Sequence, residues 1–174
     1  MKRVYFFAHD PGGANAIAPL IHYFKDALVY AKGYALDILP NSKELFGNNI
    51  ADLNPDFIIT GTSNNDFTER NIWREAERIG IPTMAILDSW ANYGIRFSDF
   101  TQYQQSHLFD KKCTYLPTYI NVMDEFAKSE SIKDGIPAER IVVLGNPHFE
   151  HTYLHSSKQA SKQASKQALS SFQI

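Results

Sequence analysis

Residues 57–87, FIITGTSNNDFTERNIWREAERIGIPTMAIL, decide the fold class. The first three residues are apolar and β-prone and lead into Thr-Gly-Thr-Ser at 60–63, which predicts a strand buried on both faces. The following residues predict a helix with one apolar face and a glycine stop: Ile72, Ala76, Ile79 and Gly80. A second apolar run at 83–87 predicts another buried strand. Because strand, helix and strand in this order form a crossover unit, the two strands should run parallel.

The same alternation extends toward the start of the chain. The apolar run 4–8 predicts a first strand. A helix is expected after it, from apolar residues at helical spacing and a stop at Gly33: Ile17, Leu20, Ile21, Phe24 and Leu28. Pro19 lies inside this stripe and weakens the prediction near its start, unless the helix begins after Gly13. A second strand is expected at 35–39 and a brief helix around 42–46.

Regular structure is also expected toward the end of the chain. The runs 119–123 and 141–144 predict two further strands, with a helix between them that begins after an N-cap at Asp124 and stops at Gly135. The stretch 88–117 lacks a sustained period, and a loop of this length is usually functional. The whole pattern predicts an α/β fold, a single Rossmann-like, doubly wound parallel sheet with helices on both faces.

Composition narrows the functional classes. The chain has 174 residues and a formal charge of −2, with one cysteine. A chain of this size buries about 70% of its unfolded surface without disulfides or metal. A nucleic-acid surface needs a basic excess, so no nucleic-acid partner is expected. The apolar run near the start is too short for a signal peptide or a membrane span, and together with the unpaired Cys113 this predicts a cytoplasmic protein without a transmembrane segment.

The C-terminal residues differ in composition. Ser-Lys-Gln-Ala is repeated three times at 157–168, and the lysines there have no acid beside them. Such a repeat offers no large apolar residue to dock, so a frayed helix or disorder is expected. The predicted organisation is a Rossmann-like domain at 1–150 and a low-complexity tail at 151–174.

Ligands of an open parallel sheet bind at the carboxyl ends of its strands. The predicted loops at that edge are rich in glycine and polar residues. His9, Asp10 and Asp88 are the candidate catalytic residues there. The candidate ligand-binding residues are Gly12, Gly13, Asn15, Thr60, Thr62, Ser63, Trp90, Asn92, Tyr93, Arg96 and Asn146.

Each group of candidates also has a structural interpretation. Glycines at 12 and 13 let a backbone approach an anion, but the spacing matches neither a dinucleotide fingerprint nor a P-loop, and they also suit a tight turn. Thr and Ser at 60–63 suit ligand hydroxyls or helix capping. The block 88–97 combines an acid, an indole, an amide, a phenol and a guanidinium, which suits sugar or phosphate recognition. Alternatively, Trp90 and Phe97 lie in the core and Arg96 pairs with a nearby acid.

One part of the sequence resembles a known superfamily. Residues 119–150 contain Gly-Ile-Pro at 135–137 and Gly-Asn-Pro at 145–147. This block is similar to the end of the N-terminal domain of GT-B type glycosyltransferases and their epimerase relatives. The stretches 9–14 and 87–97 resemble proteins of surface-polysaccharide gene clusters within that superfamily, so the resemblance covers residues 1 to about 150.

The resemblance implies an acceptor-side domain, associated with polysaccharide or glycan biosynthesis, that binds a glycan or phosphorylated acceptor. In such enzymes a second Rossmann-like domain holds the nucleotide sugar. Because only the repeat tail follows Glu150, the chain is expected to be truncated or to need a separate chain carrying the nucleotide-sugar domain, and to be inactive alone. No cofactor is expected.

Two alternatives from other functional classes remain open. Ala8-His9-Asp10-Pro11 and His148-Phe-Glu-His151 echo the pattern of zinc-dependent sugar deacetylases, with His9, Asp10 and His151 as metal ligands. The second aspartate of that pattern falls at Gly12, so the main interpretation assigns no metal. The other alternative is a non-catalytic ligand-binding module that uses the same edge.

Overall fold

A sheet of seven parallel strands organises the chain. The computed structural model describes residues 3–39, 41–44, 50–157 and 159. The strands are β1 Val4–Ala8, β2 Leu28–Ala31, β3 Lys43–Glu44, β4 Phe57–Thr60, β5 Thr83–Ile86, β6 Tyr119–Val122 and β7 Ile141–Val143. Their order is β3-β2-β1-β4-β5-β6-β7, and every neighbouring pair is parallel. The chain winds outward in both directions from β1 and β4, so the switch point of the doubly wound sheet lies between these two strands.

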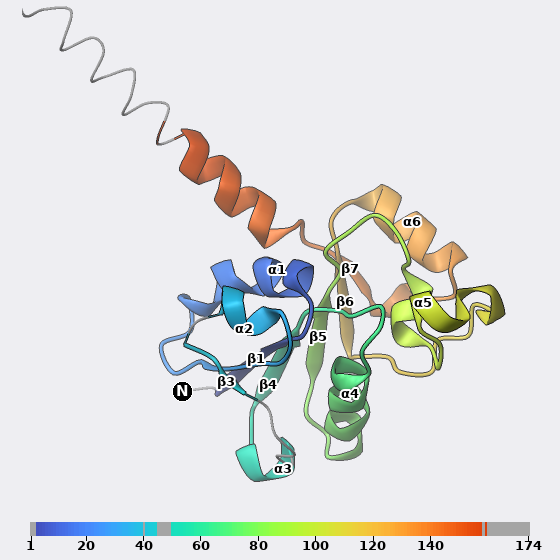
Figure 1. Cartoon of the computed structure of the whole chain (residues 1–174), viewed down its shortest axis with the longest axis horizontal. Coiled ribbons are helices and arrows are strands. Elements are labelled where there is room, and N and C mark those ends of the chain that lie inside the picture. Colours follow the sequence, from blue (N-terminus) through green and yellow to red (C-terminus); the bar gives the residue numbers. More distant parts are fainter. Residues whose placement is uncertain (1–2, 40, 45–49, 158, 160–174) are drawn as a thin grey trace, which may run out of the picture.

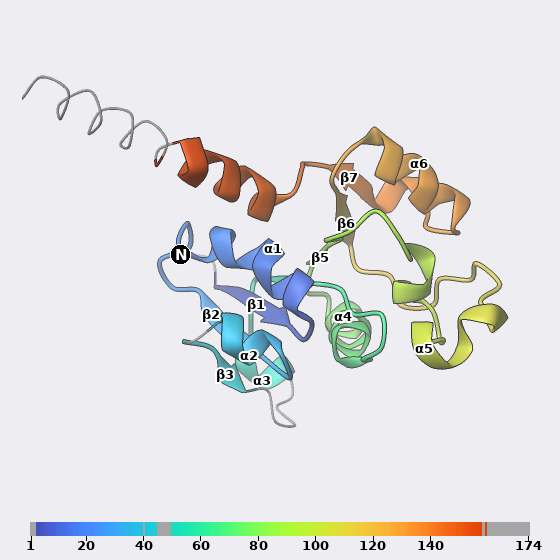
Figure 2. The same cartoon turned by 45° about the horizontal axis from the view of Figure 1, so that its top comes forward.

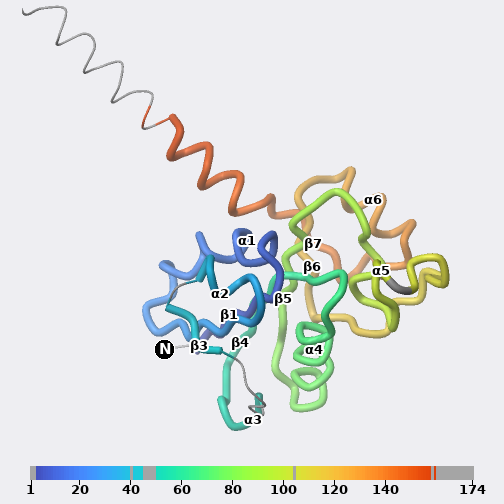
Figure 3. The backbone as a smooth tube through the Cα atoms, in the orientation of Figure 1, coloured from blue at the N-terminus to red at the C-terminus, as the bar shows by residue number. Residues whose placement is uncertain are grey.

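Helices connect the strands. The α-helices are α1 Pro11–Ile21, α2 Ala35–Ile38, α3 Ile50–Leu53, α4 Thr68–Arg78, α5 Gln102–Gln105 and α6 Glu125–Lys133. Short 3₁₀ turns lie at η1 Gly94–Phe97, η2 Ser106–Leu108 and η3 Ala138–Arg140. A last helix at residues 147–157 follows β7 and projects away from the sheet (Figure 1). The smooth backbone trace shows the same projection past α1 (Figure 3).

Two hydrophobic cores lie on opposite faces of the sheet. Successive residues of β1 point to opposite sides, so Phe6 packs with the residues of α1 and α2, whereas Phe7 packs with those of α3, α4 and α6. Figures 1 and 2 show α1 and α4 on opposite sides of the sheet. Trp73 of α4 is 1% exposed and its Nε1 donates to the Thr60 hydroxyl. This arrangement confirms the predicted fold class.

Most of the predicted elements lie where the sequence places them. The crossover unit at 57–87 contains β4, α4 and β5. Asp124 caps α6, because its carboxylate accepts a hydrogen bond from the backbone N–H of Ala127. Gly135 follows that helix with φ +94°. The long loop at 88–117 contains only short helical turns.

The region around β2 differs from the prediction. The strand predicted at 35–39 is wrong: residues 35–38 form α2, and the second strand is β2. Leu28, which the helical stripe includes, lies in β2 opposite Tyr5. Gly33 has φ +59° and turns the chain after β2, so it does not end α1. The periodicity misleads here because the apolar stripe runs through the turn between Ile21 and the strand.

Two smaller predictions also need correction. Residues 43 and 44 pair with β2 as the short strand β3, where a brief helix was expected, and residues 45 and 46 of that prediction lie outside the described residues. The first helix begins at Pro11 and contains Pro19, so it does not start after Gly13. Of the tail prediction, residues 158 and 160–174 lie outside the described residues. The structure does not test the boundary at 150.

Candidate functional site

Backbone contacts between loops shape the carboxyl edge. A Cβ atom on Gly12 would lie 1.7 Å from Asp88 Oδ2, so the carboxylate sits directly against this glycine. A Cβ atom on Gly61 would lie 2.6 Å from the Cα of Gly13. Only glycine allows the first turn of α1 to approach the loop after β4 this closely. Loop packing gives these glycines a structural role, and the Asp88 carboxylate lies against Gly12. Anion binding at Gly12 and Gly13 stays a prediction.

Arg96 forms the centre of a hydrogen-bond network beside these glycines. Arg96 is 4% exposed. Its Nη1 lies 2.6 Å from Asp88 Oδ1 and 2.6 Å from the Thr62 hydroxyl. Its Nη2 donates to the Ser89 hydroxyl and its Nε to the Asn92 carbonyl, at 2.7 and 3.2 Å. The guanidinium thus ties the loop after β5 to the loop after β4. The geometry favours the structural interpretation, in which Arg96 pairs with a nearby acid, and a ligand contact by Arg96 stays a prediction.

His9 and Asp10 form a second polar cluster at the end of β1. His9 Nδ1 lies 2.7 Å from Asp10 Oδ1, and His9 Nε2 lies 3.7 Å from Asp66 Oδ2. The hydrogen bond to Asp10 raises the pKa of His9, although burial opposes it. Burial would raise the pKa of Asp10, but hydrogen bonds from His9 and Ser63 lower it. The pair therefore joins an ionised carboxylate to an imidazole that is easily protonated.

Two acidic side chains from outside the predicted set complete this cluster. Glu69 in the first turn of α4 is 1% exposed, and its Oε1 accepts the backbone N–H of His9 at 3.1 Å. Its Oε2 has no hydrogen-bond partner within the described part of the chain. Burial raises the pKa of Glu69 to about 7. Asp66 accepts hydrogen bonds from Thr68 and from Lys32 Nζ, the latter at 3.0 Å, so the Lys32 ammonium is already paired.

Trp90 lies at the far side of the same edge, over β6 and β7. Its Nε1 donates to Asp124 Oδ2 at 2.8 Å. Its ring stacks on Phe149, with the centroids 5.7 Å apart and 14° between the planes. The indole is 47% exposed, so the alternative that places Trp90 in the core is wrong, whereas Phe97 is fully buried. The block 88–97 therefore divides into an exposed turn at 90–92, which carries the indole, and the buried residues 93–97.

The remaining candidates have mixed positions. Thr60 is buried beneath Trp73, and the Ser63 hydroxyl accepts the amides of Asn65 and Asp66 in the turn before α4. Asn15 is half-buried on α1, Asn92 is exposed with φ +57°, Tyr93 is 5% exposed and Asn146 is 8% exposed. The Asn146 side chain accepts the amide of His148 at the start of the last helix. Whether these residues bind a ligand stays a prediction.

The geometry does not favour the zinc alternative. His151 lies on the exposed helix at 147–157, and its ring is 4.1 Å from that of His155. Among the described residues, no group of three or more His, Cys, Asp or Glu side chains is placed to hold a metal ion. His9 and Asp10 bond to each other in the loop after β1.

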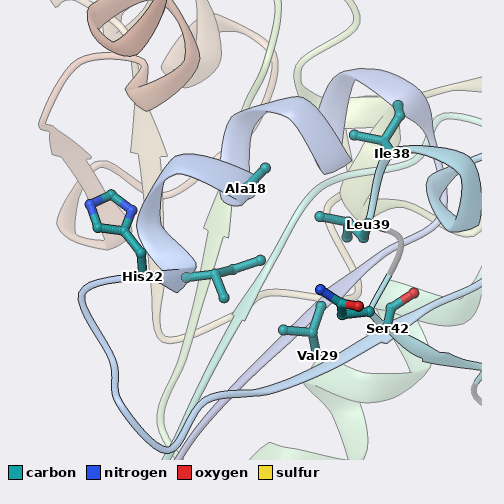
Figure 4. Close-up of a pocket in the computed structure, with 8 residues that line it drawn as sticks. Ala18, His22, Val29, Ile38, Leu39 and Ser42 are labelled. Carbon is teal, nitrogen blue, oxygen red and sulfur yellow. The ribbon is translucent and has the colours of Figure 1, made fainter.

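A separate pocket of about 290 Å³ lies between α1, β2 and α2 (Figure 4). Its walls are mainly apolar, with Ala18 on α1, Val29 on β2 and Leu39 directly after α2. It contains none of the predicted site residues. We therefore place the candidate site at the carboxyl edge.

Sequence reasoning missed Asp66, Glu69 and Lys32, together with the buried Arg70. The Asp-x-x-Glu spacing at 66–69 ahead of a helix is a capping signal that points to this turn. Arg70 donates to the carbonyls of Ile95 and Arg96, which no local pattern predicts.

Comparison with known proteins finds similar solved structures but no matching sequence family. No family model matches the sequence, and no curated protein matches it. UDP-GlcNAc 2-epimerase from Neisseria meningitidis, solved bound to UDP-GlcNAc, is similar with a TM-score of 0.58 and 14% identity, over 98% of this chain and 54% of that one. The same enzyme from Rickettsia bellii is similar with a TM-score of 0.58 and 15% identity, over 91% of this chain and 48% of that one.

A third similar structure is HepE of Anabaena in complex with UDP-glucose, with a TM-score of 0.53 and 16% identity, over 84% of this chain and 44% of that one. The domain thus shares its Rossmann-like α/β fold with part of each of these structures. This chain spans about half the length of these proteins. No helix in the described part of the chain is long and apolar enough to cross a membrane.

Proposed function

We propose that this domain is the acceptor side of a glycosyltransferase-like enzyme of polysaccharide or glycan biosynthesis. The nucleotide sugar is held by a second domain, on further polypeptide of the same protein or on a separate chain. Similar folds occur in proteins solved with UDP-sugars, and this domain corresponds to about half of each. That likeness supports the proposal at the level of the fold.

The charge distribution at the carboxyl edge is the observation that supports an acceptor-binding role over a nucleotide-sugar-binding role. A nucleotide sugar brings a diphosphate, which needs unpaired cations or free backbone amides. Arg96 is bonded within the protein, and Lys32 is paired with Asp66. The Asp88 carboxylate lies against Gly12, where a phosphate would otherwise approach the turn. With these cations already paired, the edge offers a diphosphate little charge to bind and better suits a ligand that is rich in hydroxyls.

His9 is the best candidate for a general base in this proposal. An acceptor hydroxyl must lose its proton during transfer, and an imidazole oriented by a carboxylate is suited to accept it. Asp10 fixes the ring through Nδ1, so the proton would be exchanged at Nε2, which lies 3.7 Å from Asp66 Oδ2. Asp88, the other catalytic candidate, serves as the counter-ion of Arg96.

Isothermal titration of the purified chain tests the proposal. UDP-GlcNAc, UDP-glucose and UDP alone should each bind more weakly than about 10 μM, which corresponds to about −7 kcal/mol. Glycan fragments should bind, and His9→Gln should leave their affinity unchanged, because the base acts on the reaction rather than on binding. Binding of a UDP-sugar tighter than 10 μM would place a donor site on this domain and refute the acceptor-side assignment.

The non-catalytic binding module remains the second candidate. It shares the glycan ligand and differs only in turnover. Transfer from a nucleotide sugar by the 174-residue chain together with its nucleotide-sugar domain, abolished by His9→Gln, separates the two. Glycan binding without any such transfer favours the module.

A further inference from the structure

The chain contains two tryptophans in opposite environments. Trp73 is 1% exposed in the core, whereas Trp90 is 47% exposed at the ligand edge of the sheet. Trp90 therefore presents part of its indole to solvent at the edge where ligands of an open parallel sheet bind, and an aromatic face there is available for a ligand contact.

The exposed indole is held in a fixed plane. Asp124 holds the Nε1 atom, and Asp124 is itself fixed because its Oδ1 caps α6 at 2.7 Å from the Ala127 amide. Phe149 stacks on the ring from the helix that follows β7. The two supports come from different segments, Asp124 from the turn after β6 and Phe149 from the helix after β7, so the orientation does not depend on the loop of Trp90 alone. A ring fixed in this way loses little entropy when a ligand binds it.

The chemistry of the remaining surface limits the ligand. Because Nε1 is already bonded to Asp124, the exposed part of the indole is carbon and offers no hydrogen bond. A flat, weakly polar face is therefore required of the ligand, as in the C–H face of a pyranose ring or in a nucleobase. Hydrogen bonds from the Ala127 amide and Trp90 lower the pKa of Asp124, so a carboxylate stands beside the ring at neutral pH. That charge disfavours a phosphate and hence a nucleotide.

We propose that Trp90 is a stacking platform for one sugar ring of a glycan, at a subsite separate from the His9–Asp10 pair. This inference rests on the proposed function in taking a glycan as the ligand. Trp90 is supported by residues after β6 and β7, while His9 follows β1. Trp90 itself lies in the loop after β5, and β1 and β5 are two strand spacings apart, which is about 10 Å. A ligand that reaches both groups is longer than one sugar, so the structure favours an oligosaccharide acceptor over a monosaccharide.

Titration with neutral oligosaccharides tests the platform directly. The probes are gluco-, manno-, galacto- and N-acetylglucosamine oligomers of one to six residues. Nitrogen-15 NMR shows one indole N–H signal for each tryptophan. The Trp90 signal should shift with at least one series, and the Trp73 signal should stay in place. Lack of any Trp90 shift with every series at 10 mM would overturn the proposal.

Three variants separate stacking from support of the fold. Trp90→Ala should weaken binding of the longer oligomers about tenfold or more and leave the monosaccharides unaffected, whereas Trp90→Phe should stay within about threefold because it keeps a flat ring. Tyr153→Ala is the matched control, because Tyr153 is a 73% exposed aromatic residue on the same helix as Phe149. It should bind as the unaltered chain does. Thermal melts check that all three variants fold.

The outcomes also distinguish this inference from the proposed function. Equal affinity of Trp90→Ala and the unaltered chain for the longest oligomer, with both folded, would refute the platform and leave the acceptor-side assignment standing. A Trp90 signal that responds to UDP or UMP and not to oligosaccharides would refute it in favour of a nucleotide site. Oligosaccharide binding through Trp90 together with tight UDP-sugar binding elsewhere would retain the platform and refute the acceptor-side assignment.

Discussion

Arg96→Ala is expected to destabilise the domain strongly. The Arg96 and Asp88 side chains are 5% and 17% exposed, so alanine leaves a largely buried carboxylate without its cation. It also removes the donors that reach the Thr62 and Ser89 hydroxyls. Removing one partner of a buried ion pair typically costs about 3–5 kcal/mol, and a domain of this kind has about 5–15 kcal/mol of stability in total. We therefore expect a loss of about 3–5 kcal/mol.

Urea denaturation, followed by the fluorescence of the buried Trp73, measures this loss. Arg96→Lys should be intermediate, since one ammonium keeps the charge but cannot reach acceptors on several sides. Arg78→Ala is the control, because Arg78 also pairs with a carboxylate, Glu75, but its side chain is 66% exposed. It should leave the midpoint unchanged. A loss below about 1 kcal/mol for Arg96→Ala would refute the structural role and return Arg96 to the ligand-binding residues.

Two further predictions concern the other half of the edge. Burial raises the pKa of Glu69 from its ordinary 4.5 to about 7, so the folded chain holds a proton that the unfolded chain has released. Stability should therefore fall by about 3 kcal/mol as the pH rises from 4.5 to 7, and Glu69→Gln should flatten this fall in urea titrations at pH 5 and 8; parallel behaviour of both proteins would contradict the assignment. Gly61→Ala forces the loop after β4 away from Gly13 and should cost about 1–3 kcal/mol in thermal denaturation. An unchanged melting temperature would show that the two loops separate freely.

The sequence predicts the fold well where local signals agree. In residues 57–87 the apolar runs, the helical face and the stop at Gly80 all indicate one crossover unit, and the structure contains it. At residues 17–39 the signals conflict, because a helical stripe runs into the β-prone residues of β2. The helical spacing of the apolar residues cannot by itself show where α1 ends, because the sequence after Ile21 contains no proline and no glycine before Gly33.

The candidate site is harder to predict because its contacts are distant in sequence. Thr62 and Arg96 are 34 residues apart, and His9 and Glu69 are 60 apart. The predicted loop positions put Arg96, Trp90 and His9 at the carboxyl edge. They do not show which of these side chains point into the protein. Trp90 stays exposed because its partners, Asp124 before α6 and Phe149 in the last helix, cover only part of the indole.

The inward and outward residues of the loop after β5 depend on each other. Arg96 bonds to Asp88 and Ser89 on one side of Trp90 and to the Asn92 carbonyl on the other, so it fixes both ends of the segment that carries the indole. Partial unfolding of this loop would release Trp90 from its plane and weaken a stacked ligand. Arg96→Ala should therefore lower stability and glycan affinity together, whereas Trp90→Ala should lower affinity alone. That contrast separates a residue that holds the loop from the residue that contacts the ligand, although both lie in the same block, 88–97.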